Sequence, residues 1–133
     1  MKPLLVPPDP ERAIVDYLTA RLRARGDQTA VGTDLPADWT VRSADFVQVA
    51  DDGGTLLRRV HYRHTVRVTV WSGVKSRGRS LASLCLGLLL CHPGDELVAG
   101  VPEAGGLLLA VDPTTKGRMA SFTATVNLLA QPA

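Results

Sequence analysis

Two stretches of the chain alternate hydrophobic and polar side chains at every second position. Valine occupies alternate positions within "TVRVTVW", residues 65–71, and a similar alternation runs through residues 120–129. Successive side chains of a β-strand point to opposite faces of a sheet, so both stretches are predicted to be strands with one buried face and one partly exposed face. We expect the first strand to span residues 57–71, and any break in it to fall near His61. The inward side chains of the second strand would be Phe122, Ala124, Val126 and Leu128.

Two other segments have the apolar spacing of helices. The first, residues 9–25, begins with Asp9 as an N-cap and Pro10 in the first helical position. It ends in a run of arginines, and Gly26 suits the position after the C-terminus. The second, residues 78–91, is apolar on more than one side and too short to span a membrane, so we expect it to be buried. The apolar stripe of the first helix would be Ile14, Leu18 and Leu22.

The remaining segments are typical of short strands joined by turns. We expect hairpin turns at "DDGG" (51–54), "EAGG" (103–106) and "DPTTKG" (112–117), and a buried Trp39 in the loop before residue 46. The resulting order is one helix, several strands, a second helix and three more strands. It favours an α+β fold with a mostly antiparallel sheet of about five or six strands and both helices packed on one face. The length suits one domain, residues 1–133, with residues 1–8 as an extended N-terminal arm.

The net charge, the first residues and the two cysteines limit the classes of function that the sequence favours. The formal net charge is +2, so no overall field requires a nucleic acid partner. No secretory signal is predicted at the start of the chain. The two cysteines, Cys85 and Cys91, both fall in the second helix, where their spacing prevents them from bonding to each other. We expect both to be buried free thiols, which fits a reducing compartment.

The segment "WSGVKSRGRS", residues 71–80, is one residue away from a phosphate-binding P-loop, because Arg79 follows Gly78 where the motif has lysine. Arginine does not reproduce a compact ammonium group at the phosphates, and the neighbouring strands are predicted to be antiparallel. We therefore expect a flexible connection between strand and helix. A small nucleotide-binding enzyme that uses the Gly73–Gly78 loop remains a distant alternative.

Basic residues gather between Arg58 and Arg79, a stretch that contains no acidic residue. One interpretation is a solvated sheet face. Another is a surface that meets an acidic protein partner, because arginine beside an exposed tryptophan is typical of interface anchors. Contact with DNA phosphates is a weaker third interpretation. The candidate interface consists of Arg59, Arg63, Arg67, Trp71, Lys75, Arg77 and Arg79.

No residue pattern in the sequence predicts catalysis. His61, His64 and His92 do not form a metal-ligand set with the cysteines, and no serine lies in a nucleophile elbow. Asp51 and Asp52 precede two glycines, a pattern typical of a turn and not of a catalytic carboxylate pair. We therefore expect a protein that is not an enzyme and that binds no metal and no cofactor.

Four segments, taken in order, resemble one family. They are "PPDPERAIVDYLTARL" (7–22), "DFVQVADDGG" (45–54), "HTVRVTVWS" (64–72) followed by a short helix, and "VDPTTKGRMASFTATVNLLA" (111–130). With these segments the chain resembles, over nearly its full length, the tail terminator proteins of long-tailed (siphovirus-type) bacteriophages. No single motif is diagnostic, and the order and spacing of the elements produce the similarity.

The resemblance implies a small α/β subunit that assembles into a ring, usually a hexamer. Such a ring caps the finished tail tube, ends its polymerisation and offers a surface for head–tail joining. The implied partners are other copies of the chain, the major tail tube protein and the head-side connector protein, with DNA only as passing cargo and no membrane. The protein would belong to the virion neck and be assembled in the host cytoplasm. Other neck proteins, such as head-closure or head–tail joining subunits, are the nearest alternative.

On this hypothesis the basic stretch from Arg59 to Arg79 is one assembly surface, which pairs with acidic residues of a neighbouring copy or of the tube protein. The Gly73–Gly78 loop would be a contact segment that becomes ordered on docking.

Overall fold

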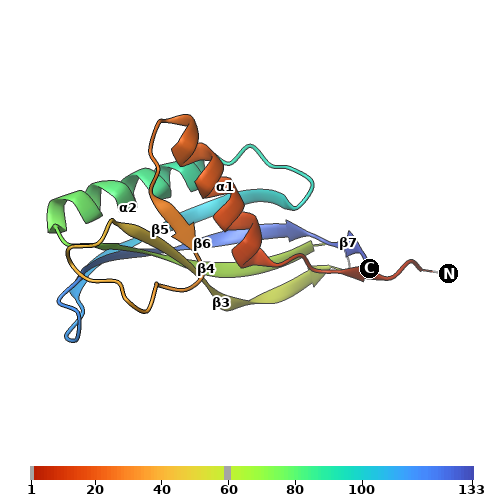
Figure 1. Cartoon of the computed structure of the whole chain (residues 1–133). Helices are drawn as coiled ribbons and strands as arrows, with labels where there is room; N and C mark the ends of the chain where they lie inside the picture. The colour runs from red at the N-terminus through yellow and green to blue at the C-terminus, as the bar shows by residue number, and fades with distance from the viewer. Residues whose placement is uncertain (1, 59–60) are drawn as a thin grey trace.

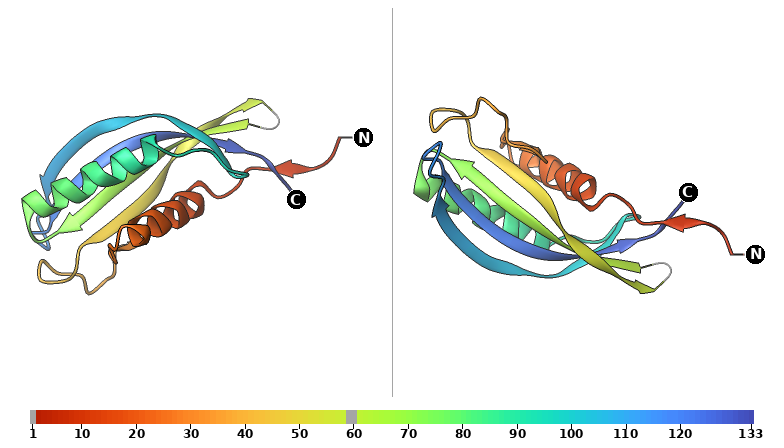
Figure 2. Two further views of the ribbon diagram at one scale, coloured as in Figure 1. Left: turned by 90° about the horizontal axis from the view of Figure 1, so that it is seen from above. Right: turned by 90° about the horizontal axis from the view of Figure 1, so that it is seen from below.

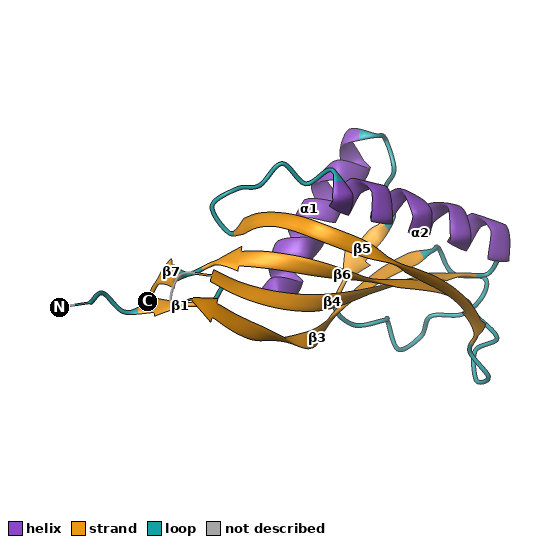
Figure 3. Cartoon of the chain, turned by 180° about the vertical axis from the view of Figure 1, so that it is seen from behind, coloured by secondary structure: helices purple, strands orange, loops and turns teal. Residues whose placement is uncertain are grey.

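The computed structural model describes residues 2–58 and 61–133. Within these residues the chain forms two helices and seven strands (Figures 1 and 3). The helices are α1 (Pro10–Ala24) and α2 (Lys75–Leu90). The strands are β1 (Leu5–Val6), β2 (Ala30–Gly32), β3 (Phe46–Arg58), β4 (His61–Ser72), β5 (Val98–Val111), β6 (Arg118–Leu129) and β7 (Gln131–Pro132). No helix among the described residues is long and apolar enough to cross a membrane.

The main sheet has five strands in the order β2-β3-β4-β6-β5, while β1 and β7 form a separate two-stranded ribbon. Only β2 and β3 are parallel, and every other pairing in both sheets is antiparallel. Both helices lie on the same face of the main sheet, as Figures 1 and 2 show. The predicted α+β fold, its mostly antiparallel sheet and the one-sided helices are therefore confirmed.

Helix α1 begins and ends where the sequence predicts. The Asp9 carboxylate accepts hydrogen bonds from the backbone N–H groups of Glu11 (3.0 Å) and Arg12 (3.4 Å). After the helix, Gly26 adopts a positive φ of 80°, a conformation that glycine adopts without strain. The predicted stripe of Ile14, Leu18 and Leu22 is fully buried against the sheet.

The two central strands, β4 and β6, supply the middle of the core. They pair without a register shift over the full length of β4, from His61 to Ser72. The valines of β4 face the helices and are fully buried, and the alternate side chains of β6 lie opposite α2 beside them. The predicted inward set is confirmed: Phe122, Ala124, Val126 and Leu128 are each at most 1% exposed.

The turn predicted at residues 51–54 is wrong, because β3 continues through it. Asp51 pairs with Val66 and Gly54 pairs with His64, so the two residues between them face a single residue of β4. This is a β-bulge, and Gly53 takes the positive φ of 102° within it. The connection from β3 to β4 falls at residues 59–60, outside the described residues. Residues 57–58 consequently belong to β3, and β4 begins at His61, where a break was expected.

A second turn, predicted at residues 103–106, is also wrong. These residues lie inside β5, whose pairing with β6 is interrupted by three register shifts. The turn predicted at residues 112–117 is confirmed, since Lys116 N–H donates to the carbonyl of Asp112 (2.8 Å). The Asp112 carboxylate accepts from the backbone N–H of Thr115 (2.8 Å), which fixes the turn between β5 and β6.

The cysteines differ in environment. Cys85 is buried as predicted, and burial raises the pKa of its thiol to about 12. Cys91 is exposed, so its predicted burial is wrong. It is the C-cap residue that follows Leu90, the last residue of α2.

The loop after α2 contains a histidine, His92, whose side chain is only 1% exposed. Its ring stacks on the ring of Tyr17 with centroids 4.2 Å apart, and its Nδ1 accepts a hydrogen bond from the N–H of Gly94 (2.9 Å). An imidazolium ring has no acceptor nitrogen, so this bond requires the neutral form. Burial lowers the pKa of His92, and Arg21 also lowers it, while Asp95 acts in the opposite direction.

Acid should therefore destabilise the fold through His92. The folded-state pKa lies below the unfolded value of about 6.5, so below that pH the unfolded chain binds a proton that the folded chain does not. We expect the free energy of unfolding to fall as the pH drops through about 6.5 and to fall less steeply in His92→Gln. Denaturant unfolding at a series of pH values measures both slopes. Equal slopes in the two proteins would assign the acid sensitivity to another group.

Candidate assembly interface

The structure does not bring the seven predicted interface residues together. Arg59 lies outside the described residues. Arg63 and Arg67 lie on the helix-free face of β4, opposite to its buried valines. The other three cations, Lys75, Arg77 and Arg79, lie on the first turns of α2. Arg63 and Arg67 lie about 30 Å and about 17 Å along β4 from its end at Ser72. Because α2 also covers the opposite face of the sheet (Figures 1 and 2), the two groups form separate surfaces.

Acidic partners from β3 and the segment before it neutralise part of this charge. A guanidinium nitrogen of Arg67 lies 3.0 Å from the carboxylate of Asp52, which sits in the β-bulge. Arg77 donates from two nitrogens to the two carboxylate oxygens of Asp45, each at 2.9 Å. The stretch from Arg58 to Arg79 contains no acidic residue, but the fold brings acidic residues from other parts of the chain next to two of its arginines.

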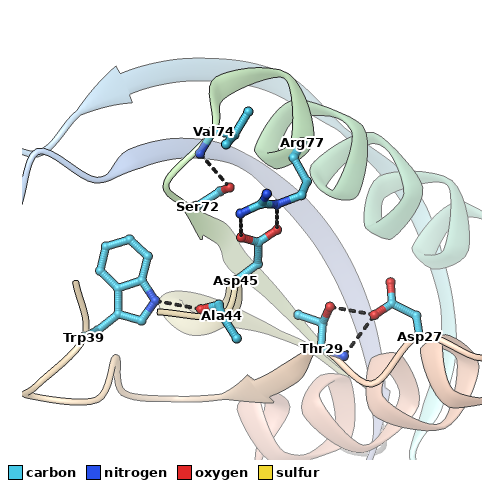
Figure 4. A network of polar contacts seen from close by, with 8 residues as sticks. All are labelled: Asp27, Thr29, Trp39, Ala44, Asp45, Ser72, Val74 and Arg77. Carbon is cyan, nitrogen blue, oxygen red and sulfur yellow. Dashed lines mark hydrogen bonds and ion pairs between the residues drawn. The ribbon is translucent and has the colours of Figure 1, made fainter. Parts of the chain in front are cut away.

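The ion pair between Arg77 and Asp45 is the centre of a polar network at the start of α2 (Figure 4). The Asp45 side chain is only 10% exposed, while that of Arg77 is 56% exposed. Hydrogen bonds on either side of the pair hold the neighbouring segments, one from the indole of Trp39 to the carbonyl of Ala44 (2.9 Å). A shallow hollow of about 470 Å³ opens beside the pair. Because the guanidinium and the carboxylate already bind each other, the network anchors α2 to the segment that precedes β3.

The segment predicted to be a flexible glycine loop is mostly helical. Helix α2 begins at Lys75, and the N–H of Gly78 donates to the carbonyl of Val74 (3.0 Å) within the first turn. A β-carbon on Gly78 would lie 3.1 Å from Cβ of Ser72, so this glycine allows the helix to approach β4 closely. The expected flexible loop is wrong, because residues 75–78 are helical, whereas contact of this segment with a partner stays a prediction. The nucleotide-binding alternative lacks the Gly73–Gly78 loop that it requires.

Trp71 is not the exposed anchor that the sequence predicts. It is 9% exposed and belongs to a second hydrophobic cluster with Trp39 and Phe46. The two indole rings meet edge to face with centroids 5.7 Å apart, and the Trp71 N–H donates to Oε1 of Gln48 (3.0 Å). This cluster lies on the helix-free side of the sheet. The predicted burial of Trp39 is confirmed. Its side chain packs against Trp71 and helps to shield Trp71 from solvent.

Besides single exposed residues such as Val41, Val74 and Leu90, exposed apolar side chains gather at two places that the sequence analysis did not select. Near the end of β5, Leu108, Leu109 and Val111 are 69%, 38% and 47% exposed. In the N-terminal arm, Leu4 and Val6 are 72% and 38% exposed. The available signal was the run of apolar residues after Gly106, which lacks the alternation of a strand with one wet face. The sequence predicts a short strand here but does not show which of its side chains are exposed, because that depends on neighbouring strands.

Comparisons with known proteins do not identify the chain. No protein-family model matches it, and no curated protein matches it significantly. The resemblance to tail terminator proteins therefore depends on the order and spacing of the sequence segments quoted above. The two apolar surfaces and the unpaired cations are the features from which a function can be argued.

Proposed function

We propose that this chain is a structural subunit of a long-tailed bacteriophage virion, similar to the tail terminator proteins that its sequence resembles. In this role, copies of the chain form a ring, a hexamer if the resemblance holds, on the end of the finished tail tube. The ring ends tube polymerisation and provides the surface to which the head-side connector attaches. The protein then acts by binding other proteins in the virion neck and not by catalysis.

The outer edge of β5 is the observation that carries this proposal. The strand is 14 residues long, and within the described residues no strand pairs with its outer edge. Its last residues expose large apolar side chains, of which Leu108 is the most exposed. Open strand edges are templates for pairing with another chain, and exposed apolar patches mark interaction sites. A subunit whose task is assembly requires such a surface.

Cationic side chains without an ion-pair partner among the described residues are a second feature that supports the proposal. Arg67 and Arg77 are neutralised within the chain, whereas Arg63, Lys75 and Arg79 have no ion-pair partner among the described residues. They are the members of the predicted interface that remain available to an acidic partner. Such contacts at the rim of an interface mainly raise association rates and weaken as salt is added.

Tube capping tests the proposal. We expect this chain, when it is added to the major tail tube protein during polymerisation, to shorten the tubes. Electron micrographs should then show a thin cap on one end of each tube. Leu108→Ser should lower the capped fraction because it removes the most exposed side chain of the β5 edge. Leu90→Ser, at a residue 48% exposed on α2, is the matched control. Long, uncapped tubes would contradict the proposal, and attachment to the connector alone would indicate a head–tail joining protein.

A further inference from the structure

The chain has an arm that projects from one end (Figure 2). At the other end lies a cavity with both apolar and basic lining residues. The arm consists of residues 2–8 with β1, and it lies beside β7. The cavity lies at the start of β6, near Arg118, whereas β7 follows the end of the same strand. The twelve residues of β6 span about 40 Å, so the arm cannot reach the cavity of its own molecule.

The arm has the properties of a segment that binds a partner. Strands β1 and β7 have two residues each and pair only with each other among the described strands. A small isolated two-stranded ribbon is at best marginally stable in water. Leu4 and Val6 expose apolar side chains, and Pro7 and Pro8 restrict the backbone that follows. A segment held extended before binding loses little conformational entropy when it docks.

The cavity can accept an apolar side chain. It has a volume of about 200 Å³ and lies between the first turn of α2 and the β5–β6 hairpin. An apolar cavity of about 150 Å³ holds a molecule of the size of benzene, so an aliphatic side chain fits. Its apolar walls include Leu109, Val111 and Met119, and Lys75 and Arg118 add positive charge. The open edge of β5 runs along it and offers backbone groups for pairing.

Charges at the two ends are complementary. Glu96 lies beside the arm, because its carbonyl accepts a hydrogen bond from the side chain of Gln131 in β7 (2.8 Å). Its side chain is exposed, as are those of Lys75 and Arg118 at the cavity. None of these three residues has an ion-pair partner within the described parts of the chain. An acid beside the arm therefore matches two bases beside the cavity.

We propose that the arm of one copy docks on the outer edge of β5 of the next copy. Leu4 enters the cavity beside α2, and Glu96 faces Lys75 and Arg118. The contact is heterologous, so its repetition yields a closed ring or an open filament. The closed ring rests on the proposed function, whereas the docking itself is a property of two copies and can be tested without any phage component.

Disulfide trapping between two copies tests the docking. The exposed Cys91 is first changed to serine, while the buried Cys85 remains. Leu4→Cys in one protein and Leu109→Cys in a second, distinguished by a mass tag, are mixed at millimolar concentration under mild oxidation. We expect a disulfide-linked dimer that contains one copy of each, with about twice the 14.2 kDa mass of one chain. Circular dichroism verifies that each variant is folded.

The matched control pairs Leu4→Cys with Leu90→Cys, because Leu90 is at least as exposed as Leu109 (48% against 38%) but lies at the other end of α2 from the cavity. A trapping rate at least tenfold above this control supports the docking, and a rate equal to the control overturns it. Glu96→Lys in the arm-donating copy should slow trapping severalfold at low salt. Combining it with Lys75→Glu and Arg118→Glu in the receiving copy should restore the trapping rate, because the charges are then complementary again. A trapping rate that does not change with these substitutions would overturn the proposed arrangement.

The outcomes separate this inference from the proposed function. Capped tubes without trapping above the control would overturn the docking and leave the proposed function in place. Trapping without capped tubes would support the docking and contradict the proposed function.

Discussion

Replacing Trp71 with alanine should lower the free energy of unfolding by about 3–5 kcal/mol, the usual cost of truncating a large buried aromatic side chain. Trp71 packs against Trp39 beneath the segment that precedes β3. The substitution leaves a cavity there and removes the hydrogen bond to Gln48. Urea unfolding measures the loss. Because Trp39 is then the only tryptophan, its fluorescence also reports how far its surroundings loosen.

Trp71→Phe is the control for this prediction. It keeps an aromatic ring in the cluster but loses the indole N–H and some volume, so we expect a cost of about 1–2 kcal/mol. The comparison also distinguishes a core residue from an interface anchor. An alanine variant with unchanged stability and impaired assembly would contradict the structural assignment of Trp71.

The elements that the sequence predicted well are those specified by neighbouring residues. Helix α1 depends on its N-cap Asp9, its apolar stripe and the terminal Gly26, and all of these act within one or two turns. The alternation in β4 and β6 is likewise local, because one buried face imposes it on each strand. These signals were sufficient for the fold class and for the face of the sheet that the helices cover.

The two wrong turns show what local signals do not contain. Glycines at 53 and 106 adopt positive φ in the structure, as the turn predictions required. The same backbone conformation also occurs in a β-bulge, and pairing with a neighbouring strand decides between the two. In residues 51–54 the chain stays paired with β4 on both sides of the bulge, so the strand continues. This choice depends on residues ten or more positions away.

The candidate interface failed for a related reason. The stretch around Arg67 and Arg77 was predicted to lack acidic partners because the sequence between Arg58 and Arg79 contains no acid. In the structure the partners come from elsewhere in the chain: Asp52 lies in β3, and Asp45 directly precedes it. The exposed edge of β5 was missed because no local pattern tells an edge strand from a central one. Surfaces for assembly are set by the order of strands in the sheet, and that order depends on long-range pairing.

Replacing Gly73 with alanine should lower the free energy of unfolding by about 2–3 kcal/mol, because the added methyl group has no space. A β-carbon at this position would overlap the backbone carbonyl oxygen of Val41. Backbone atoms cannot move aside as the end of a flexible side chain can, so the connection from β4 to α2 must shift. That shift would also move Lys75 and the cavity beside it, and we therefore expect slower trapping of the arm at temperatures at which the variant is folded.

Gly87→Ala is the matched control for Gly73→Ala, because the same methyl group is added at a place with free space. Apart from its chain neighbours and the nearby backbone of its own helix, no described atom lies within 4 Å of a β-carbon at Gly87, which is an exposed residue inside α2. Alanine stabilises a helix interior by about 0.5–1 kcal/mol relative to glycine, so this variant should unfold at a higher denaturant concentration than the parent. Opposite signs for the two substitutions, measured by urea unfolding, would show that Val41 holds the start of α2 in place. If Gly73→Ala left stability and trapping unchanged, the close approach of these two segments would be wrong, and so would the position of the cavity that depends on it.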